Sequence, residues 1–268
     1  MPARRPSYWF STEKCPPPPI SIVITTHHRP VLLRRAIMSA VRQGDLSEII
    51  LCADEASAQT ARVAAELLRP TDSFLQLPHL RGPAETRNIG MSVARGQWVC
   101  FLDDDDSIED GFFDRALPIL RDTEDVVYVN YTQIREDVAD DGTARETSRR
   151  QISLRQHRVR DLAVQNFIPS SALFIPRRLL DGLSFDPALA SHEDWDFILH
   201  LWRRAGFRHA DITGPNYHVS NSATRNDTGA AARADIYQQI YLRHKHVRPR
   251  SWYKRLKKLR HIRSQIGA

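Results

Sequence analysis

Apolar and polar positions follow two alternating patterns along the N-terminal part of the chain. Short runs rich in β-branched and aromatic residues, typical of buried strands, cover residues 20–26, 48–52, 74–77 and 97–102. Apolar residues at helical spacing lie between these runs and predict helices over residues 30–43, 58–68 and 83–95. Because strands and helices alternate, we expect an α/β fold whose central sheet is mostly parallel and covered by helices on both faces.

The second half of the chain is less regular. Its pattern predicts a charged loop over 135–150, a helix over 193–204 and strands over 126–134, 167–175 and 207–212. Residues 230–268 combine helical spacing with many basic side chains. We therefore expect three parts: an N-terminal extension ending in a stiff proline run (1–19), an α/β domain (20–228) and a C-terminal basic helical segment (229–268).

The composition is that of a globular protein, with 41% hydrophobic and 26% charged residues in a chain of 268. The cysteines, Cys15, Cys52 and Cys100, lack metal-ligand spacing, and their odd number argues against a disulfide framework. We therefore expect reduced thiols and a cytoplasmic protein. No apolar stretch approaches the ~20 residues of a membrane-spanning helix, and residues 1–19 lack the apolar core of a signal peptide.

The C-terminal segment concentrates the positive charge of a chain whose formal net charge is +6. Residues 244–263 contain no acidic side chain. On a helix they would gather Trp252, Leu256, Leu259 and Ile262 on one face and basic residues on the others. Two interpretations stay open. The helix lies in the interface of an anionic membrane, with the protein peripheral on its inner face, or it packs against the preceding domain.

Polar clusters follow three of the predicted strands. They are residues 25–29 (Thr-Thr-His-His-Arg), residues 54–55 (Asp-Glu) and the carboxylate run 103–106. Since ligands bind at the carboxyl ends of parallel strands, we expect these clusters to line one cleft. Four adjacent carboxylates repel one another unless a cation neutralises them, so the run predicts a Mg²⁺ or Mn²⁺ site for a diphosphate. The alternative is a solvated acidic turn.

Three further positions admit a functional and a structural interpretation. Arg87, near the start of a predicted helix, can meet a phosphate or remain an exposed helical arginine. Residues 191–196 (Ser-His-Glu-Asp-Trp-Asp) can supply a general base or a helix cap. Residues 216–225 suit a loop that closes on phosphates, with His218 as a candidate metal ligand, or a plain hydrophilic loop.

Four segments, in this order and spacing, resemble family 2 glycosyltransferases of the GT-A fold. They read ISIVITTHHRPVLLRRAIMSAVRQ, ADEAS, ETRNIGMSVARGQWVCFLDDDD and SHEDWDFILHLW, and the resemblance extends from Ile20 to Arg225. It implies a metal-dependent hexosyltransferase. Such an enzyme moves a sugar, with inversion, from a nucleotide-diphosphate donor to an acceptor hydroxyl, in glycan or envelope polysaccharide synthesis.

The resemblance also implies roles for individual residues. It places the donor nucleotide, expected to be that of a UDP-sugar, against Thr25, Thr26, His27, Arg29, Asp54, Glu55, Arg87, Asp103 and Asp104. It makes Asp105 the nearest metal ligand, with His218 as a further one, and Asp194 the catalytic base. The additional candidates are Asp106, Glu193 and Arg225.

Two departures from the family pattern leave the nucleobase open, uridine or another. Histidines replace the usual aromatic residue and asparagine after the first strand, and Ala56 replaces a glycine. A sugar nucleotidyltransferase is a second hypothesis, although residues 25–30 lack its glycine-rich phosphate loop. A basic nucleic-acid-binding protein is a third, although a carboxylate cleft would repel its phosphates. We expect no nucleic-acid partner. The resemblance implies a glycan, lipid-linked or small-molecule acceptor, and we expect residues 135–167 to select it.

Overall fold

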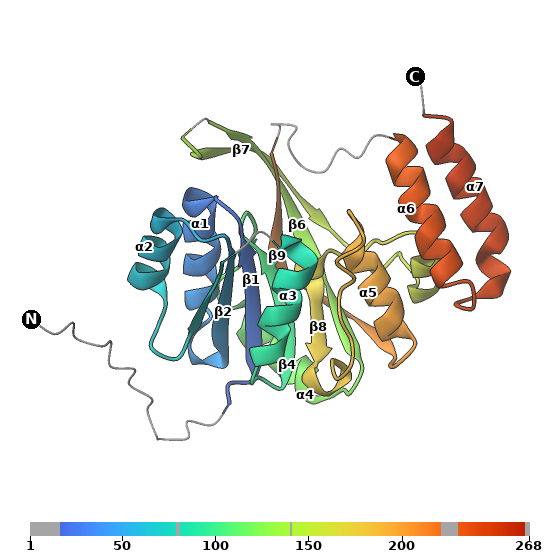
Figure 1. The fold of residues 1–268 in the computed structure, drawn as a ribbon. Coiled ribbons are helices and arrows are strands. Elements are labelled where there is room, and N and C mark those ends of the chain that lie inside the picture. The colour runs from blue at the N-terminus through green and yellow to red at the C-terminus, as the bar shows by residue number, and fades with distance from the viewer. Residues whose placement is uncertain (1–16, 79–80, 140, 221–229, 266–268) are drawn as a thin grey trace, which may run out of the picture.

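The computed structural model describes residues 17–78, 81–139, 141–220 and 230–265 (Figure 1). Its α-helices are α1 (Pro30–Val41), α2 (Ala58–Leu67), α3 (Gly82–Val93), α4 (Phe112–Arg121), α5 (Glu193–Trp202), α6 (Ala230–Arg243) and α7 (Trp252–Arg263). Its strands are β1 (Ile20–Thr26), β2 (Ser47–Asp54), β3 (Ser73–Leu77), β4 (Trp98–Asp103), β5 (Ser107–Ile108), β6 (Val126–Val138), β7 (Ala144–Ile152), β8 (Leu173–Pro176) and β9 (Phe207–Ser220).

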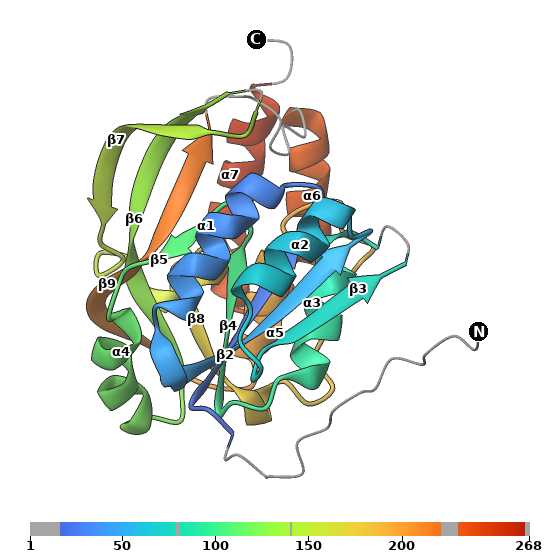
Figure 2. The same cartoon turned by 90° about the vertical axis from the view of Figure 1, so that its left-hand side faces the viewer.

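The strands form one sheet in the order β3-β2-β1-β4-β8-β6-β9-β5, and β7 pairs with β6 beside this row. The first four strands of the row run parallel, as the alternating pattern predicts. The other half is mixed, because β8 runs antiparallel to both β4 and β6 while β9 runs parallel to β6. Helices α1 and α2 cover one face of the sheet, and α3 and α5 cover the other (Figures 1 and 2). The predicted α/β architecture is confirmed.

Strands β1 and β2 are buried almost throughout, which explains their unbroken apolar runs. The buried thiols of Cys52 and Cys100 lie in this layer. Helix α3 approaches the sheet closely at Gly90, where an added Cβ would lie 2.4 Å from Cγ1 of Val23. This contact fixes the start of α3, which carries Arg87, over the carboxyl end of β1.

Two predictions for the irregular half are wrong. Residues 135–150 form a β-hairpin of β6 and β7, because the backbone of β7 pairs with β6 although nearly all of its side chains are exposed. An exposed edge strand buries no face, so it has no apolar alternation to detect. Of residues 167–175, only the last three belong to a strand, β8. The sequence pattern also missed α4, a helix that contains Pro118.

Residues 216–220 are not part of a loop. They extend β9, and His218 pairs in register with Ile134 of β6. Neighbouring strands supply the backbone hydrogen bonds here, so polar residues keep an extended conformation without an apolar pattern. Arg225 lies outside the described residues.

The C-terminal segment forms two adjacent helices, α6 and α7, that pack beside α5 (Figure 1). Tyr237 and Tyr241 of α6 contact the ring of Trp195, with centroids 4.8 and 5.7 Å away. The predicted apolar face of α7 is divided between two environments. Leu259 and Ile262 belong to the core, whereas Trp252 and Leu256 are exposed. No helix in the described part of the chain is long and apolar enough to span a membrane.

We predict that Gly90→Ala destabilises the protein by about 1–3 kcal/mol, because a methyl group at this position overlaps Val23 and forces α3 away from β1. Chemical denaturation measures the loss. Ser92→Ala, at an exposed position of the same helix, is the control and should change stability by less than about 0.5 kcal/mol. Equal stability of the two variants would contradict the close approach.

Candidate active site

The polar clusters predicted at the strand ends do meet in one cavity. Thr25 of β1 pairs in register with Asp103 of β4, and β2 flanks β1 on its other side. A cavity of about 430 Å³ opens at these ends. Its wall includes most of the predicted donor-binding and metal-binding residues, namely Thr25, Thr26, His27, Arg29, Asp54, Arg87, Asp103, Asp104 and Asp105, and the additional candidate Glu193.

Each carboxylate of the acidic run has a partner in the protein. Asp103 accepts a hydrogen bond from Arg87, and Asp104 accepts one from the Thr26 hydroxyl, both 2.8 Å long. The Arg29 guanidinium lies 3.0 Å from Asp105 and 3.3 Å from Asp104. Burial and repulsion from Asp105 raise the pKa of Asp104 to about 7. The run is therefore a set of buried, paired carboxylates, and the alternative of a solvated turn is wrong.

The remaining carboxylate of the run points toward β9. Oδ1 of Asp106 accepts the backbone N–H of His218 at 3.0 Å, and the side chain of Asp106 is almost fully buried. The imidazole of His218 is held on both sides, with Nδ1 2.7 Å from Glu136 and Nε2 3.0 Å from the Ser107 hydroxyl. Burial, together with the charge of Arg35, lowers the pKa of His218. A metal bound to His218 would replace one of these two contacts.

The donor set at the cavity fits a divalent cation that is shared with substrate phosphates. Carboxylate oxygens are the ligands that Mg²⁺ and Mn²⁺ prefer, and Mg²⁺ takes only one or two from the protein when phosphates complete its shell. Asp105 lies in the cavity wall. Asp103, Asp105 and His218 do not form a closed ligand cage, since their ligand atoms are not grouped within 4.8 Å of one another.

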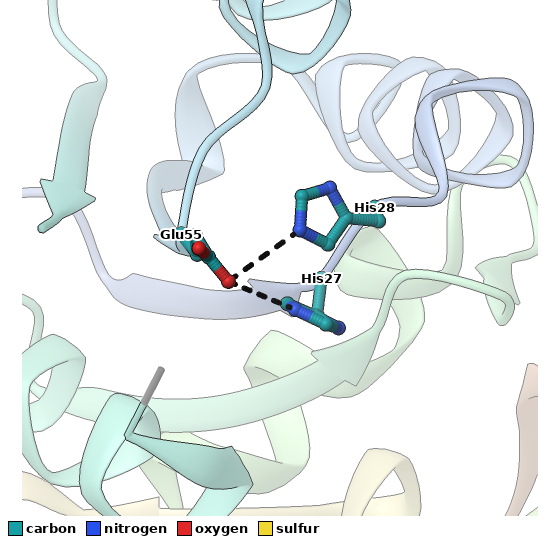
Figure 3. Close-up of side chains that lie close together, drawn as sticks. All are labelled: His27, His28 and Glu55. Carbon is teal, nitrogen blue, oxygen red and sulfur yellow. Dashed lines mark ion pairs between the residues drawn. The ribbon is translucent and has the colours of Figure 1, made fainter. Parts of the chain in front are cut away.

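Side chains at the mouth of the cavity form a different group. His27, His28 and Glu55 are exposed and face one another (Figure 3). Oε2 of Glu55 lies 3.8 Å from Nε2 of His27 and 3.7 Å from Nε2 of His28. Both His28 and Glu55 adopt left-handed backbone conformations, with φ of 54° and 53°. The tight turns after β1 and β2 thus bring the two predicted nucleobase contacts, His27 and Glu55, together.

Asp54 has a positioning role in the same wall. Its carboxylate accepts the backbone N–H groups of Arg81 and Gly82, at 2.8 Å each, where the chain enters α3. A carboxylate at this place suits the positive end of the helix dipole. Asp54 therefore ties the end of β2 to the start of α3.

Arg87 is buried and bridges two carboxylates. Its guanidinium donates to Asp103 at 2.8 Å and to Glu193 of α5 at 2.7 Å. Burial alone would lower the pKa of Arg87, but attraction to both carboxylates outweighs it and raises the pKa. The interpretation of Arg87 as an exposed helical arginine is wrong.

A second cavity, of about 460 Å³, lies on the other side of the ion pair group formed by Arg87, Asp103 and Glu193. It shares Arg87, Asp103 and Glu193 with the first cavity, and Asp194 and Asn166 line its wall. The two cavities thus meet at three charged side chains. A molecule in one can react with a molecule in the other only near this boundary.

Asp194 lines the second cavity next to Glu193 and is half-buried. Oδ2 of its carboxylate accepts the Asn166 amide at 2.9 Å, and Oδ1 accepts the N–H of Trp195 at 2.7 Å. Burial, with repulsion from Glu193, raises the pKa of Asp194 to about 6. The N-cap of α5 is His192, which makes no side-chain capping bond. Asp194 does not serve as the N-cap, and a raised pKa suits a general base.

Several side chains of the site escaped the sequence analysis. Asn166 holds Asp194 from an irregular segment, and Glu136 and Arg35 surround His218 from β6 and α1. Asn166 and Glu136 lie outside the four family-like segments, and Arg35 lies within the first of them but has no role assigned by the resemblance. Their partners lie 28 to 101 residues away along the chain, so no local pattern could reveal them.

A comparison with known protein families shows the family to which the chain belongs. The model of glycosyl transferase family 2 matches residues 21–180, which is more than half of the chain. The chain belongs to glycosyl transferase family 2. The match includes most residues that line the two cavities and ends before Glu193 and Asp194.

Individual relatives share part of the chain. An uncharacterised glycosyltransferase of Haemophilus influenzae is 25% identical over 172 residues, which are 61% of this chain and 57% of that protein. The GalNAc(5)-diNAcBac-PP-undecaprenol β-1,3-glucosyltransferase of Campylobacter jejuni is 40% identical over 88 residues, 31% of this chain and 28% of that protein. The chain therefore spans little more than half the length of the first relative and less of the second.

The fold has close counterparts among solved structures. The structure of S. aureus TarS in complex with UDP-GlcNAc superposes with a TM-score of 0.65 at 17% identity, over 85% of this chain and 67% of that one. The corresponding UDP complex gives a TM-score of 0.62. At this level of identity the likeness shows a shared GT-A fold.

We predict that Arg87→Met destabilises the protein by about 3–5 kcal/mol, since it leaves Asp103 and Glu193 buried without a cation. Lowering the pH should restore part of this stability as the carboxylates take up protons. Arg34→Met, which breaks an exposed ion pair with Glu66, is the control and should leave the unfolding midpoint unchanged. If the two variants have the same unfolding midpoint, the ion pairs of Arg87 with Asp103 and Glu193 do not stabilise the site.

Proposed function

We propose that this chain transfers a sugar, with inversion, from a nucleoside-diphosphate sugar to an acceptor hydroxyl. The observation that supports the proposal most directly is the meeting of two cavities at Arg87, Asp103 and Glu193, with Asp194 on the side away from the strand ends. The first cavity takes the donor, and the second takes the acceptor. Membership of glycosyl transferase family 2 agrees with this division.

The donor nucleotide binds at the ends of β1 and β2. His27 presents an exposed imidazole for stacking on the base, and Glu55 beside it accepts hydrogen bonds from a base edge. A uridine diphosphate donor is supported by the TarS complexes with UDP and UDP-GlcNAc. Asp105 would hold Mg²⁺ or Mn²⁺, and such an ion would stabilise the negative charge of the leaving diphosphate.

The protein residues around the anomeric carbon divide the remaining work. The Asp194 carboxylate removes the proton of the acceptor hydroxyl, and the freed oxygen bonds to the anomeric carbon as the bond from that carbon to the diphosphate oxygen breaks. The bonding electrons leave with the nucleoside diphosphate. Asn166 orients Asp194, and Arg87 holds Glu193 and Asp103 away from the acceptor oxygen by pairing with both.

The acceptor is proposed to be a lipid-linked or envelope glycan, reached at the cytoplasmic face of a membrane. Trp252, Tyr253 and Leu256 are exposed on α7 amid basic residues, a combination that suits a membrane surface. The name of the C. jejuni relative gives an undecaprenol-linked acceptor for that protein. Residues 166–170, in the wall of the second cavity, would select the acceptor here.

We predict that Asp105→Ala abolishes metal-dependent binding of UDP while the protein stays folded, because the cation loses its protein ligand. Calorimetry with UDP and Mn²⁺ measures the affinity, and circular dichroism checks the fold. Asp114→Ala, which removes an exposed carboxylate of α4, is the control. Unchanged UDP affinity of the Asp105 variant would contradict the metal assignment.

We predict that Asp194→Asn retains UDP binding but lowers sugar transfer by about 10²–10⁴-fold, because an amide cannot accept the proton. Circular dichroism checks that the variant stays folded, since the Asn amide accepts only one of the two hydrogen bonds that the carboxylate accepts. Wild-type transfer should rise with pH through about 6, where Asp194 ionises among Glu193, Arg87 and Asp103. If the variant transfers sugar at a rate within about threefold of the wild-type rate, Asp194 is not the general base.

A further inference from the structure

A cation-lined cavity lies at the start of α7, away from the donor and acceptor cavities. Its volume is about 350 Å³, and it forms between α7 and the 3₁₀ turn Val159–Ala163. Four basic side chains line it, Arg160, Arg248, Arg250 and Lys254, together with one acidic side chain, Asp161. The cavity therefore carries an excess of positive charge and suits an anion.

The charges that line this cavity are available to a ligand. In the described part of the chain, no carboxylate forms an ion pair with any of the four cations. Asp161 already accepts the backbone N–H of Arg158 at 3.0 Å. No side chain caps the N-terminus of α7, because the Ser251 hydroxyl donates instead to the carbonyl of Arg248 at 2.7 Å. The helix dipole adds to the attraction for an anion.

The helix that contributes Lys254 to this cavity also exposes apolar side chains. Trp252, Tyr253 and Leu256 follow Ser251 in the first turns of α7, and their exposed fractions are 40%, 75% and 38%. Leu259 and Ile262, further along the helix, are buried and anchor it to the protein. A soluble anion would leave the exposed rings without a partner. A phosphate on a lipid would place them at the surface of the bilayer.

The cavity is joined to the acceptor side by a short, fixed segment. Val164 lines the cation-lined cavity, and Asn166, two residues later, holds Asp194. Two residues span at most about 7 Å. Arg255 is buried and donates to the carbonyls of Ala163 and Val247, at 2.7 Å each, so α7 is attached firmly to this segment. A membrane bound at the cavity would therefore lie beside the acceptor cleft.

We propose that this cavity binds the phosphate group of an anionic membrane lipid. Arg160, Arg248, Arg250 and Lys254 contact the phosphate, and Trp252, Tyr253 and Leu256 enter the interface. One consequence of lipid binding, that the acceptor cleft faces the membrane, rests on the proposed function. The binding site itself stands on the cavity, its charge and the exposed apolar residues.

Co-sedimentation of the full-length protein with vesicles tests the proposal. The vesicles consist of phosphatidylcholine alone or of phosphatidylcholine with phosphatidylglycerol. The variant Arg250→Ser/Lys254→Ser removes two charges from the cavity, and Lys257→Ser/Arg260→Ser removes two exposed charges from later turns of the same helix. We expect binding only with phosphatidylglycerol, weakened about 30-fold by the cavity variant and at most about 3-fold by the control.

Three results would overturn the proposal. Equal losses in the two charge variants would show diffuse attraction without a binding site. Unchanged vesicle binding by Trp252→Ala at raised salt would show that no ring enters the interface. Displacement from vesicles by millimolar inorganic phosphate, with calorimetric binding of phosphate to the same cavity, would assign the site to a free anion.

A parallel measurement separates this inference from the enzymatic proposal. Thermal stabilisation by UDP with Mn²⁺ reports on the donor site, and both charge variants should retain it. Loss of vesicle binding with intact UDP stabilisation supports the lipid site and shows that the variants fold. Absence of UDP stabilisation in the wild type would contradict the proposed function and leave the vesicle result standing.

Discussion

The site depends on one buried guanidinium. Arg87 of α3 pairs with Asp103 at the end of β4 and with Glu193 at the start of α5, residues 16 and 106 positions away along the chain. Without it two carboxylates would face each other in a buried place, and their repulsion would drive the elements apart. The ion pair group therefore holds the two halves of the active site at a fixed separation.

Each carboxylate around this group has its properties set by its neighbours. Asp103 and Glu193 share the single positive charge of Arg87, and Asp105 pairs with Arg29 in the first cavity. Among the described residues, Asp194 accepts hydrogen bonds from an amide and a backbone N–H, and desolvation together with repulsion from Glu193 raises its pKa. The carboxylates on the two sides of Arg87 therefore have different partners.

The C-terminal helices are bound to α5, the helix that carries Asp194. Trp195, next to Asp194, packs between tyrosines of α6, and Asp196 bonds to His244 at 2.8 Å. Arg255 of α7 fastens the pair to the segment before Asn166. An event at the exposed end of α7 is therefore connected to the acceptor side through buried contacts, while the donor cavity lies on the far side of Arg87.

By itself the sequence determined the strands and helices of the first half and the clustering of residues 25–29, 54–55 and 103–106, because strand and helix periodicity and the shared carboxyl edge of parallel strands are local or general properties. The tertiary structure decided which side chains are buried and which residues they contact. It placed β7 as an exposed edge strand, brought Asn166 to Asp194, engaged His218 with Glu136, and divided the apolar face of α7 between core and solvent. Spacing shows which side chains share a face, but burial and pairing depend on partners distant in the chain.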